Sequence, residues 1–135
     1  MQKIQVAIVE DIQIIREGLK SILDSTDGFI CSGVYGTGEE AAAALGDLKP
    51  NVVLMDINLP TLDGLGATRR IRENDALRDI PIVAITAFGT EGFQRAAYDV
   101  GVSGYLTKPL DLDRMNQLIA RLLSPTGSGN LSSLT

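Results

Sequence analysis

Five short apolar runs alternate with helical patterns along this chain, and this alternation limits the possible folds more than any other feature of the sequence. The central run, Val52–Met55, holds four apolar residues without a polar break. Such a run is typical of a strand that is buried on both faces, and therefore of a sheet with helices on each side. By this pattern we expect strands at Ile4–Val9, Phe29–Val34, Asn51–Asp56, Ile82–Thr86 and Gly104–Lys108.

The segments between these runs carry helical patterns. Ile12–Leu23 has apolar residues at helical spacing, and an Ala-rich helix over Ala41–Leu48 follows a capping-box sequence that begins at Thr37. The other expected helices are Leu65–Arg72, Glu91–Val100 and a last one that Asp111 caps. Strands that alternate with helices favour a parallel sheet with right-handed crossovers. We therefore expect one α/β domain with a doubly wound five-stranded parallel sheet, flavodoxin-like, in the strand order 2-1-3-4-5.

Composition excludes several classes of function. The formal net charge of −5 argues against a nucleic-acid-binding surface, because phosphate groups need a basic patch. The chain has no histidine, which excludes histidine-based catalysis, histidine metal ligands and a phosphohistidine within it. Cys31 is the single cysteine, so no intramolecular disulfide can form. We see no signal-peptide pattern and no apolar run of membrane-spanning length, and we expect a cytoplasmic domain without a membrane contact.

Charged and hydroxyl side chains stand where four of the expected strands end. Glu10 and Asp11 follow the first strand, the third ends at Asp56, the fourth at Thr86 and the fifth at Lys108. Because the carboxyl ends of parallel strands form one edge of the sheet, we expect these side chains to gather there. Three carboxylates in one place repel one another unless a cation joins them, and Mg²⁺ prefers oxygen ligands of this kind.

Further groups suit the same site. The backbone carbonyl of Asn58, two residues after Asp56, can supply another oxygen to the ion. The Lys108 ammonium and the Thr86 hydroxyl suit a tetrahedral oxyanion, one by its charge and the other as a hydrogen-bond donor. The residues alone therefore indicate a carboxylate nucleophile, a metal ion and a phosphoryl group.

Each of these residues has a simpler explanation when it is taken singly. Asp56 could cap the loop that follows it, and Glu10 and Asp11 could stabilise the N-terminus of the next helix. Thr86 is a common strand residue, and Lys108 could be a solvated charge. The complete set, in which every member stands at a strand end, favours a functional site over these explanations.

Two other motifs receive a structural interpretation. We interpret the arginines Arg69, Arg70 and Arg72 as the solvated outer face of their helix. Asp63-Gly64 is interpreted as a turn, and we assign it no part in the chemistry.

From Lys3 to about Ser124 the chain resembles the receiver domain of a two-component response regulator, of the chemotaxis-regulator type. The residues that carry the resemblance are the Glu10-Asp11 pair, the segment Asp56–Gly64, Thr86-Ala87, Gly101 and Gly104–Pro109. Each short motif is weak by itself, whereas all of them in order, each at its own strand end, make a chance match very rare.

The resemblance implies a role for each site residue. Asp56 is the phosphoacceptor, Lys108 contacts the phosphoryl group, and Mg²⁺ is held by Glu10, Asp11, Asp56 and the Asn58 backbone carbonyl. The resemblance also implies that the Thr86 hydroxyl and the rotating Tyr105 ring act as the switch residues. It further implies a cis Lys108–Pro109 peptide bond. The implied function is a signalling switch that a sensor histidine kinase or a phosphotransfer protein phosphorylates, with slow self-catalysed chemistry rather than enzymatic turnover.

Two alternative functions remain open. An aspartyl-phosphate phosphatase of the haloacid-dehalogenase type would have a second aspartate two residues after the nucleophile, and Asn58 stands there instead. A phosphate-independent protein-interaction module on the same fold would be favoured by a missing acid or lysine, and none is missing.

The output of the switch lies outside these motifs. We expect residues 1–124 to form the receiver domain and residues 125–135 to form a flexible tail or linker stub. Val6–Ile12 and Ile15–Leu19 are similar to regulators with helix-turn-helix outputs, which favours an output domain in transcription regulation, whereas Lys108-Pro109 is closer to stand-alone receivers. A homodimer through the fourth helix, fifth strand and fifth helix is a further expectation.

Overall fold

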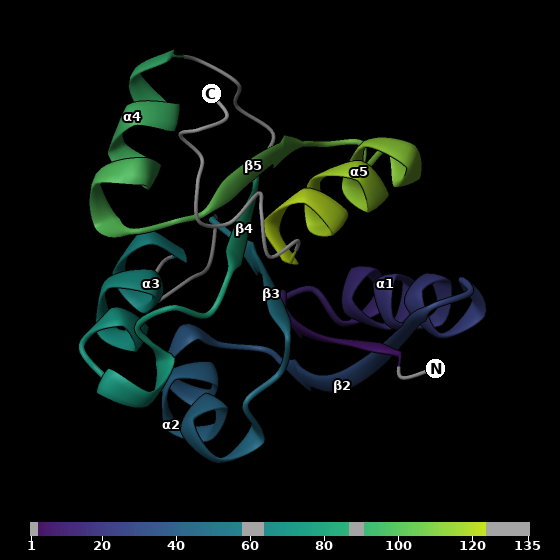
Figure 1. Cartoon of the computed structure of the whole chain (residues 1–135), viewed down its shortest axis with the longest axis horizontal. Helices are drawn as coiled ribbons and strands as arrows, with labels where there is room; N and C mark the ends of the chain where they lie inside the picture. Colours follow the sequence, from purple (N-terminus) through teal and green to yellow (C-terminus); the bar gives the residue numbers. More distant parts are fainter. Residues whose placement is uncertain (1–2, 58–63, 87–90, 124–135) are drawn as a thin grey trace.

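A computed structural model of the chain describes residues 3–57, 64–86 and 91–123. Strands and helices alternate throughout this part, as the sequence pattern predicts (Figure 1). The strands are β1 (Ile4–Val9), β2 (Phe29–Tyr35), β3 (Val52–Asp56), β4 (Ile82–Thr86) and β5 (Gly104–Thr107). The helices are α1 (Gln13–Ser25), α2 (Gly38–Leu48), α3 (Gly64–Arg72), α4 (Glu91–Val100) and α5 (Leu112–Leu123), with a short 3₁₀ helix, η1, at Asp75–Leu77.

The five strands form one parallel sheet in the order β2-β1-β3-β4-β5. The predicted topology is therefore confirmed. β3 is central because it pairs with β1 on one side and β4 on the other. This order brings the carboxyl ends of β1, β3 and β4 next to one another, and the residues that follow these strands share one edge of the sheet.

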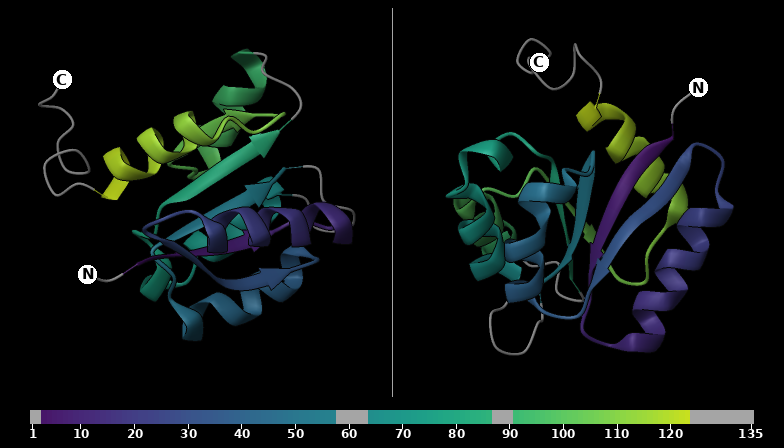
Figure 2. Two further views of the ribbon diagram at one scale, coloured as in Figure 1. Left: turned by 90° about the vertical axis from the view of Figure 1, so that its right-hand side faces the viewer. Right: turned by 90° about the horizontal axis from the view of Figure 1, so that it is seen from below.

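Side chains of each central strand alternate between two apolar cores. In β3, Val52 and Leu54 pack in the core under α1 and α5, whereas Val53 and Met55 pack in the core under α2, α3 and α4. The views in Figure 2 show the sheet between these two groups of helices. Because both faces of the strand are buried, both sets of alternate positions have to be apolar, which explains the unbroken run in the sequence.

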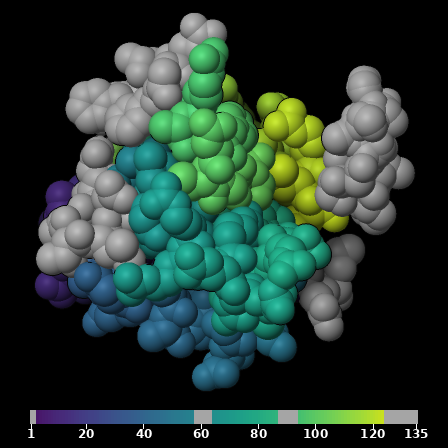
Figure 3. Space-filling model, turned by 90° about the vertical axis from the view of Figure 1, so that its left-hand side faces the viewer, coloured from purple at the N-terminus to yellow at the C-terminus, as the bar shows by residue number. Residues whose placement is uncertain are grey.

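The face of the molecule opposite α1 and α5 is covered by three helices. α2 lies beside α3, and α3 lies beside α4 (Figure 3). α1 packs mainly against β1 and β2, and α5 packs against β5. On this other face an apolar groove opens between α1 and the segment 108–110 that precedes α5, as described below.

Two predicted helix caps are confirmed. The Oγ1 atom of Thr37 accepts a hydrogen bond from the backbone N–H of Glu40 at 3.1 Å, and the Oδ1 atom of Asp111 accepts from the backbone N–H of Asp113 at 3.0 Å. The returning bond of the first cap differs from the simple capping box, because the Glu40 carboxylate accepts from the backbone N–H of Gly36 at 3.1 Å. This bond ties the turn after β2 to the start of α2.

The interpretation of the three arginines as a solvated face is wrong for Arg72. Arg69 and Arg70 are exposed, but the Arg72 guanidinium reaches the residue after α4 and donates to Gly101 O at 2.7 and 2.9 Å. It also donates to Ile80 O at 2.7 Å, to Leu77 O at 3.0 Å and to the Ser103 hydroxyl at 3.3 Å. These acceptors lie at the end of η1 or after it, and after α4, and no helical periodicity could have placed them beside α3.

Within the described residues, none of the helices is both long and apolar enough to cross a membrane.

Candidate functional site

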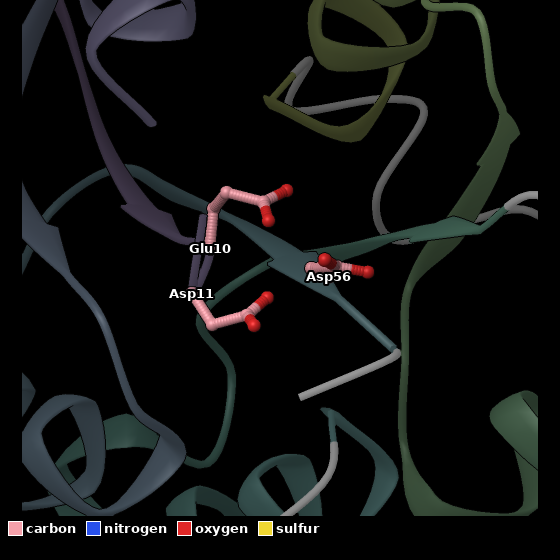
Figure 4. Close-up of side chains that lie close together, drawn as sticks. All are labelled: Glu10, Asp11 and Asp56. Carbon is pink, nitrogen blue, oxygen red and sulfur yellow. The ribbon is translucent and has the colours of Figure 1, made fainter. Parts of the chain in front are cut away.

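Three carboxylates converge at the carboxyl edge of the sheet (Figure 4). Glu10 and Asp11 directly follow β1, and Asp56 is the last residue of β3. One oxygen from each of the three side chains lies within 4.8 Å of the others. The convergence that strand order predicted is therefore present in the fold.

Burial makes this cluster electrostatically costly without a cation. Glu10 is 2 % exposed and Asp56 is 3 % exposed. Burial raises the pKa of Glu10 to about 7, and the nearby Asp56 charge adds to this rise, while a hydrogen bond from the Ile12 backbone N–H opposes it. A small divalent cation with oxygen preference fits this donor set, because it would neutralise the charges that burial leaves unsolvated. The donor set therefore suits Mg²⁺.

Lys108 supplies a positive charge beside two of these acids. Its Nζ atom lies 3.5 Å from Asp56 Oδ2 and 3.8 Å from Glu10 Oε1. The backbone N–H of Lys108 donates to Thr86 O at 2.8 Å, which continues the pairing of β4 and β5 beyond the strand. The Lys108–Pro109 peptide bond is cis, as the sequence resemblance implied. Lys108 is thus held over Asp56 while its side chain keeps some access to solvent.

Thr86 and Tyr105 occupy the opposite face of the sheet from the buried acids. Ala84 packs in the core under α2, α3 and α4, and Thr86 stands two residues later in β4, so it has the same orientation. Tyr105 packs against that same core and is the cross-strand partner of Ala84. The buried hydroxyl and the half-buried aromatic ring therefore lie on one face, next to α4.

Tyr105 also borders a surface cavity. The cavity has a volume of about 310 Å³ and lies over α4, β5 and α5. Its lining residues are Tyr98, Tyr105, Leu106, Arg114, Gln117, Leu118 and Arg121. A movement of the Tyr105 ring would change the shape of this surface.

A second, apolar cavity of about 230 Å³ adjoins the acidic cluster on the other face of the sheet. Its lining residues are Glu10, Ile15, Leu19, Ile85, Lys108, Pro109 and Leu110. The groove thus runs from α1 to the segment that carries Lys108, and Glu10 is part of its lining.

Asp63-Gly64 was interpreted as a turn with no part in the chemistry; Asp63 lies outside the described residues, and Gly64 is the first residue of α3 and lies against the main chain of the site. A Cβ atom at this position would lie 2.6 Å from the Ile57 Cα and closer still to the Asp56 carbonyl oxygen. The Gly64 backbone N–H also donates to Ile57 O at 2.9 Å. The start of α3 is therefore pressed against the main chain of Asp56, and only a residue without a side chain fits. The sequence shows a glycine after an acid, but the contact depends on the tertiary structure.

Asn58, the predicted source of a further metal-binding carbonyl, lies outside the described residues. Residues 125–135, the predicted tail, also lie outside them.

The family model of the response regulator receiver domain matches residues 6–120 of the chain. Among curated relatives, the response regulator GacA of Pseudomonas protegens is 37 % identical over 116 residues, which are 86 % of this chain and 54 % of the relative. The transcriptional regulatory protein DegU of Brevibacillus brevis is 32 % identical over 117 residues, 87 % of this chain and 49 % of the relative. The chain spans about half the length of these curated relatives.

Solved structures show the same similarity. The receiver domain of the sensor histidine kinase PA1611 from Pseudomonas aeruginosa matches with a TM-score of 0.78 and 28 % identity, over 88 % of this chain and 96 % of the neighbour. That structure has a magnesium ion coordinated in its active site cleft.

Proposed function

Since the chain belongs to the response regulator receiver domain family, we propose that Asp56 is its phosphoacceptor and that a sensor histidine kinase or a phosphotransfer protein is the donor. One observation carries this assignment. Asp56 is a buried carboxylate at the end of the central strand, with the Lys108 ammonium at 3.5 Å and two further acids within 4.8 Å. In this proposal the domain is a signalling module with slow self-catalysed phosphorylation and dephosphorylation, not an enzyme with turnover.

In the proposed reaction an Asp56 carboxylate oxygen attacks the phosphorus of a phosphohistidine or of a small acyl phosphate. The new P–O bond forms as the bond to the donor breaks, and the donor leaves with that electron pair. Lys108 neutralises charge on the phosphoryl oxygens from a position that is already set in the unphosphorylated fold. Because the lysine is preorganised, little rearrangement is needed in the transition state.

Mg²⁺ is the cofactor that we propose for this site. Glu10, Asp11 and Asp56 would hold it, with the Asn58 carbonyl as the expected further ligand. When bound, the ion would supply positive charge beside the phosphoryl oxygens. The chain's own acids cannot supply this charge, and their burial is what makes a cation necessary.

We further propose that Thr86 and Tyr105 transmit the effect of phosphorylation from Asp56 to the surface over α4, β5 and α5. Thr86 is the last residue of β4, one beyond Ile85, which is the cross-strand partner of Asp56. Its hydroxyl would therefore donate a hydrogen bond only to a phosphoryl oxygen that extends past the carboxyl edge of the sheet, where the two faces meet. Movement of Thr86 on the face next to α4 would free space for Tyr105, which borders the cavity over α4, β5 and α5. A phosphoryl group that favours one arrangement over the other would shift the population of this surface.

The partners of the switch are also part of the proposal. An output domain outside residues 1–124 would read the α4–β5–α5 surface, in transcription regulation by analogy with the relative that is named as a transcriptional regulatory protein. Alternatively, the same surface would form a homodimer with a second copy of the chain. Direct contact with nucleic acid is not expected of this domain because its net charge is −5. Residues 125–135 would act as the linker, and the cytoplasm is the compartment in which we expect donor and receiver to meet.

The intact mass of the protein after incubation with acetyl phosphate tests the assignment of Asp56. We expect one phosphoryl adduct that requires Mg²⁺ and that is absent from Asp56→Asn. Asp47→Asn is the matched control, because it makes the same chemical change at an exposed aspartate of α2. An adduct that persists in Asp56→Asn would identify another acceptor. Absence of any adduct, also with a kinase as donor, would favour the phosphate-independent interaction module.

A further inference from the structure

Arg16 lies in the first turn of α1, beside the acidic cluster, and the proposed reaction gives it no role. Its Nη1 atom donates to the backbone carbonyl oxygen of Glu10 at 2.9 Å and to that of Asp11 at 3.3 Å. One guanidinium nitrogen thus binds the main chain of both acids that follow β1. Arginine reaches them because side chains at the start of a helix tilt back toward its N-terminus.

Helix stability does not explain an arginine at this position. The N-terminus of a helix carries a positive partial charge and disfavours a cation. α1 lacks an acidic residue in its first turn, and its N-cap residue, Ile12, has no side chain that could cap it. Among the described residues, none of the ion pairs within 4.0 Å includes Arg16. The two carbonyl oxygens are therefore the contacts that account for the placement of Arg16.

The turn after β2 lies close to the guanidinium. A Cβ atom at Gly36 would lie 3.0 Å from Arg16 Nη1, so the guanidinium occupies the space that a side chain there would need. The backbone N–H of Glu10 donates to Tyr35 O at 3.0 Å, and the Glu40 carboxylate accepts from the Gly36 N–H at 3.1 Å. Arg16 thus binds the turn that carries the acids and lies close to the neighbouring turn.

We propose that Arg16 is a positioning residue of the metal site: it binds the carbonyls of Glu10 and Asp11 and thereby fixes the turn that directs their carboxylates toward Asp56. The inference rests on the proposed function, because it assigns Arg16 to the site that would hold Mg²⁺. Groups that orient metal-binding carboxylates from outside the ligand sphere commonly set metal affinity. Arg16 acts here through the main chain, and it does not touch the ion or the phosphoryl group.

The test measures the Mg²⁺ dissociation constant of the unphosphorylated protein by isothermal titration calorimetry, together with the melting temperature in EDTA. For Arg16→Ala we expect binding that is about tenfold weaker or more, the usual range for loss of such an orienting partner. The control is Lys20→Ala, which removes the same charge from an exposed position of the same helix. The Mg²⁺ dissociation constant of Lys20→Ala should stay within about twofold of the wild-type value, because the solvent screens an exposed charge that does not contact the site.

Two further variants keep the test decisive if Arg16→Ala does not fold. Arg16→Lys retains the charge and a donor nitrogen but has a shorter reach, and we expect it to recover part of the affinity. Gly36→Ala retains Arg16 and pushes a methyl group against Nη1, and we expect it to weaken Mg²⁺ binding without any change of charge.

The outcomes separate this inference from the proposed function. A lower melting temperature with an unchanged Mg²⁺ dissociation constant in Arg16→Ala would mean that Arg16 is merely structural, and the inference would be overturned. The same holds if Arg16→Lys and Gly36→Ala both bind Mg²⁺ like the wild type. If the wild type itself binds no Mg²⁺ at millimolar concentration, the metal site of the proposed function is wrong and the inference falls with it.

Discussion

Gly64 shows how strongly a single residue can constrain the position of Asp56. A side chain at Gly64 would collide with the Asp56 carbonyl and lie 2.6 Å from the Ile57 Cα. Main-chain atoms of a central strand cannot move aside as the tip of a flexible side chain can. The start of α3 and the end of β3 therefore have to shift together if any side chain is introduced.

We predict that Gly64→Ala destabilises the fold by about 1–3 kcal/mol, the usual cost of overpacking, and slows labelling of Asp56 by acetyl phosphate. Urea denaturation and intact mass against time measure the two effects. Gly18→Ala is the control, since a Cβ atom at Gly18 in α1 meets nothing within 4 Å. This exposed helical position should instead gain about 0.5–1 kcal/mol. Equal effects of the two substitutions would contradict the role of the Asp56 contact.

The raised pKa of Glu10 predicts that the stability of the metal-free protein depends on pH. Burial raises the pKa of Glu10 from 4.5 to about 7 in the fold, so folding favours the protonated carboxyl. This contribution to stability is fully present below pH 4.5 and is lost as the pH rises through about 7. In EDTA, the free energy of unfolding should therefore fall over this range, and Glu10→Gln should remove that part of the fall. Glu73→Gln, at an exposed glutamate, is the control and should retain the wild-type profile.

At the scale of elements, Arg72 connects α3 to two segments that follow it in the chain. Its guanidinium binds carbonyl oxygens at the end of η1, before β4 and after α4, at the amino edge of the sheet. The Ser103 hydroxyl, which Arg72 also contacts, accepts from the backbone N–H of Ile82 at 3.1 Å. The start of β4 and the end of α4 are thus held by one side chain, at the opposite end of the sheet from Asp56.

We predict that Arg72→Ala costs at least about 2 kcal/mol of stability, because hydrogen bonds to a charged group contribute about 1.5–3 kcal/mol and the carbonyls would lose their donor. Arg70→Ala removes an exposed arginine from the same helix and should change stability by no more than about 0.5 kcal/mol. Chemical denaturation distinguishes them. Labelling of Asp56 per folded molecule should be the same in both variants, and a selective loss in Arg72→Ala would mean that this clamp also acts on the site.

At the scale of the whole molecule, the acidic cluster predicts that Mg²⁺ stabilises the fold. Only the folded chain brings Glu10, Asp11 and Asp56 together, so the ion binds the native state preferentially. A free Mg²⁺ concentration of 100 times the dissociation constant should add about 2.7 kcal/mol to the free energy of unfolding. The melting temperature should rise with Mg²⁺ concentration and return to its starting value in EDTA.

The variant Asp56→Asn supplies the matched comparison. Loss of one buried charge should make the metal-free protein more stable, because Asp56 lies beside Glu10 without a bound cation. The same variant should lose most of the stabilisation by Mg²⁺. A full Mg²⁺ response in Asp56→Asn would show that the ion binds elsewhere.

The local pattern of the sequence was sufficient to predict the strands, the helices and the edge of the sheet at which the acids gather. Apolar runs such as Val52–Met55 and the helical spacing between them are local properties. The rules for crossover connections then leave few topologies for strands that alternate with helices. Strand order in turn brings the strand ends together, which is why Glu10, Asp56 and Lys108 could be assigned to one site before any distance was known.

Only the tertiary structure decided what Gly64 and Arg16 contact beside the site and what Arg72 contacts at the other end of the sheet. Gly64, Arg72 and Arg16 act through main-chain carbonyl oxygens, and every residue type carries such an oxygen. The sequence therefore does not show which carbonyl oxygen an arginine will contact. Which carbonyl a guanidinium reaches, or which main-chain atom excludes a Cβ, follows from packing between elements that are distant in the chain.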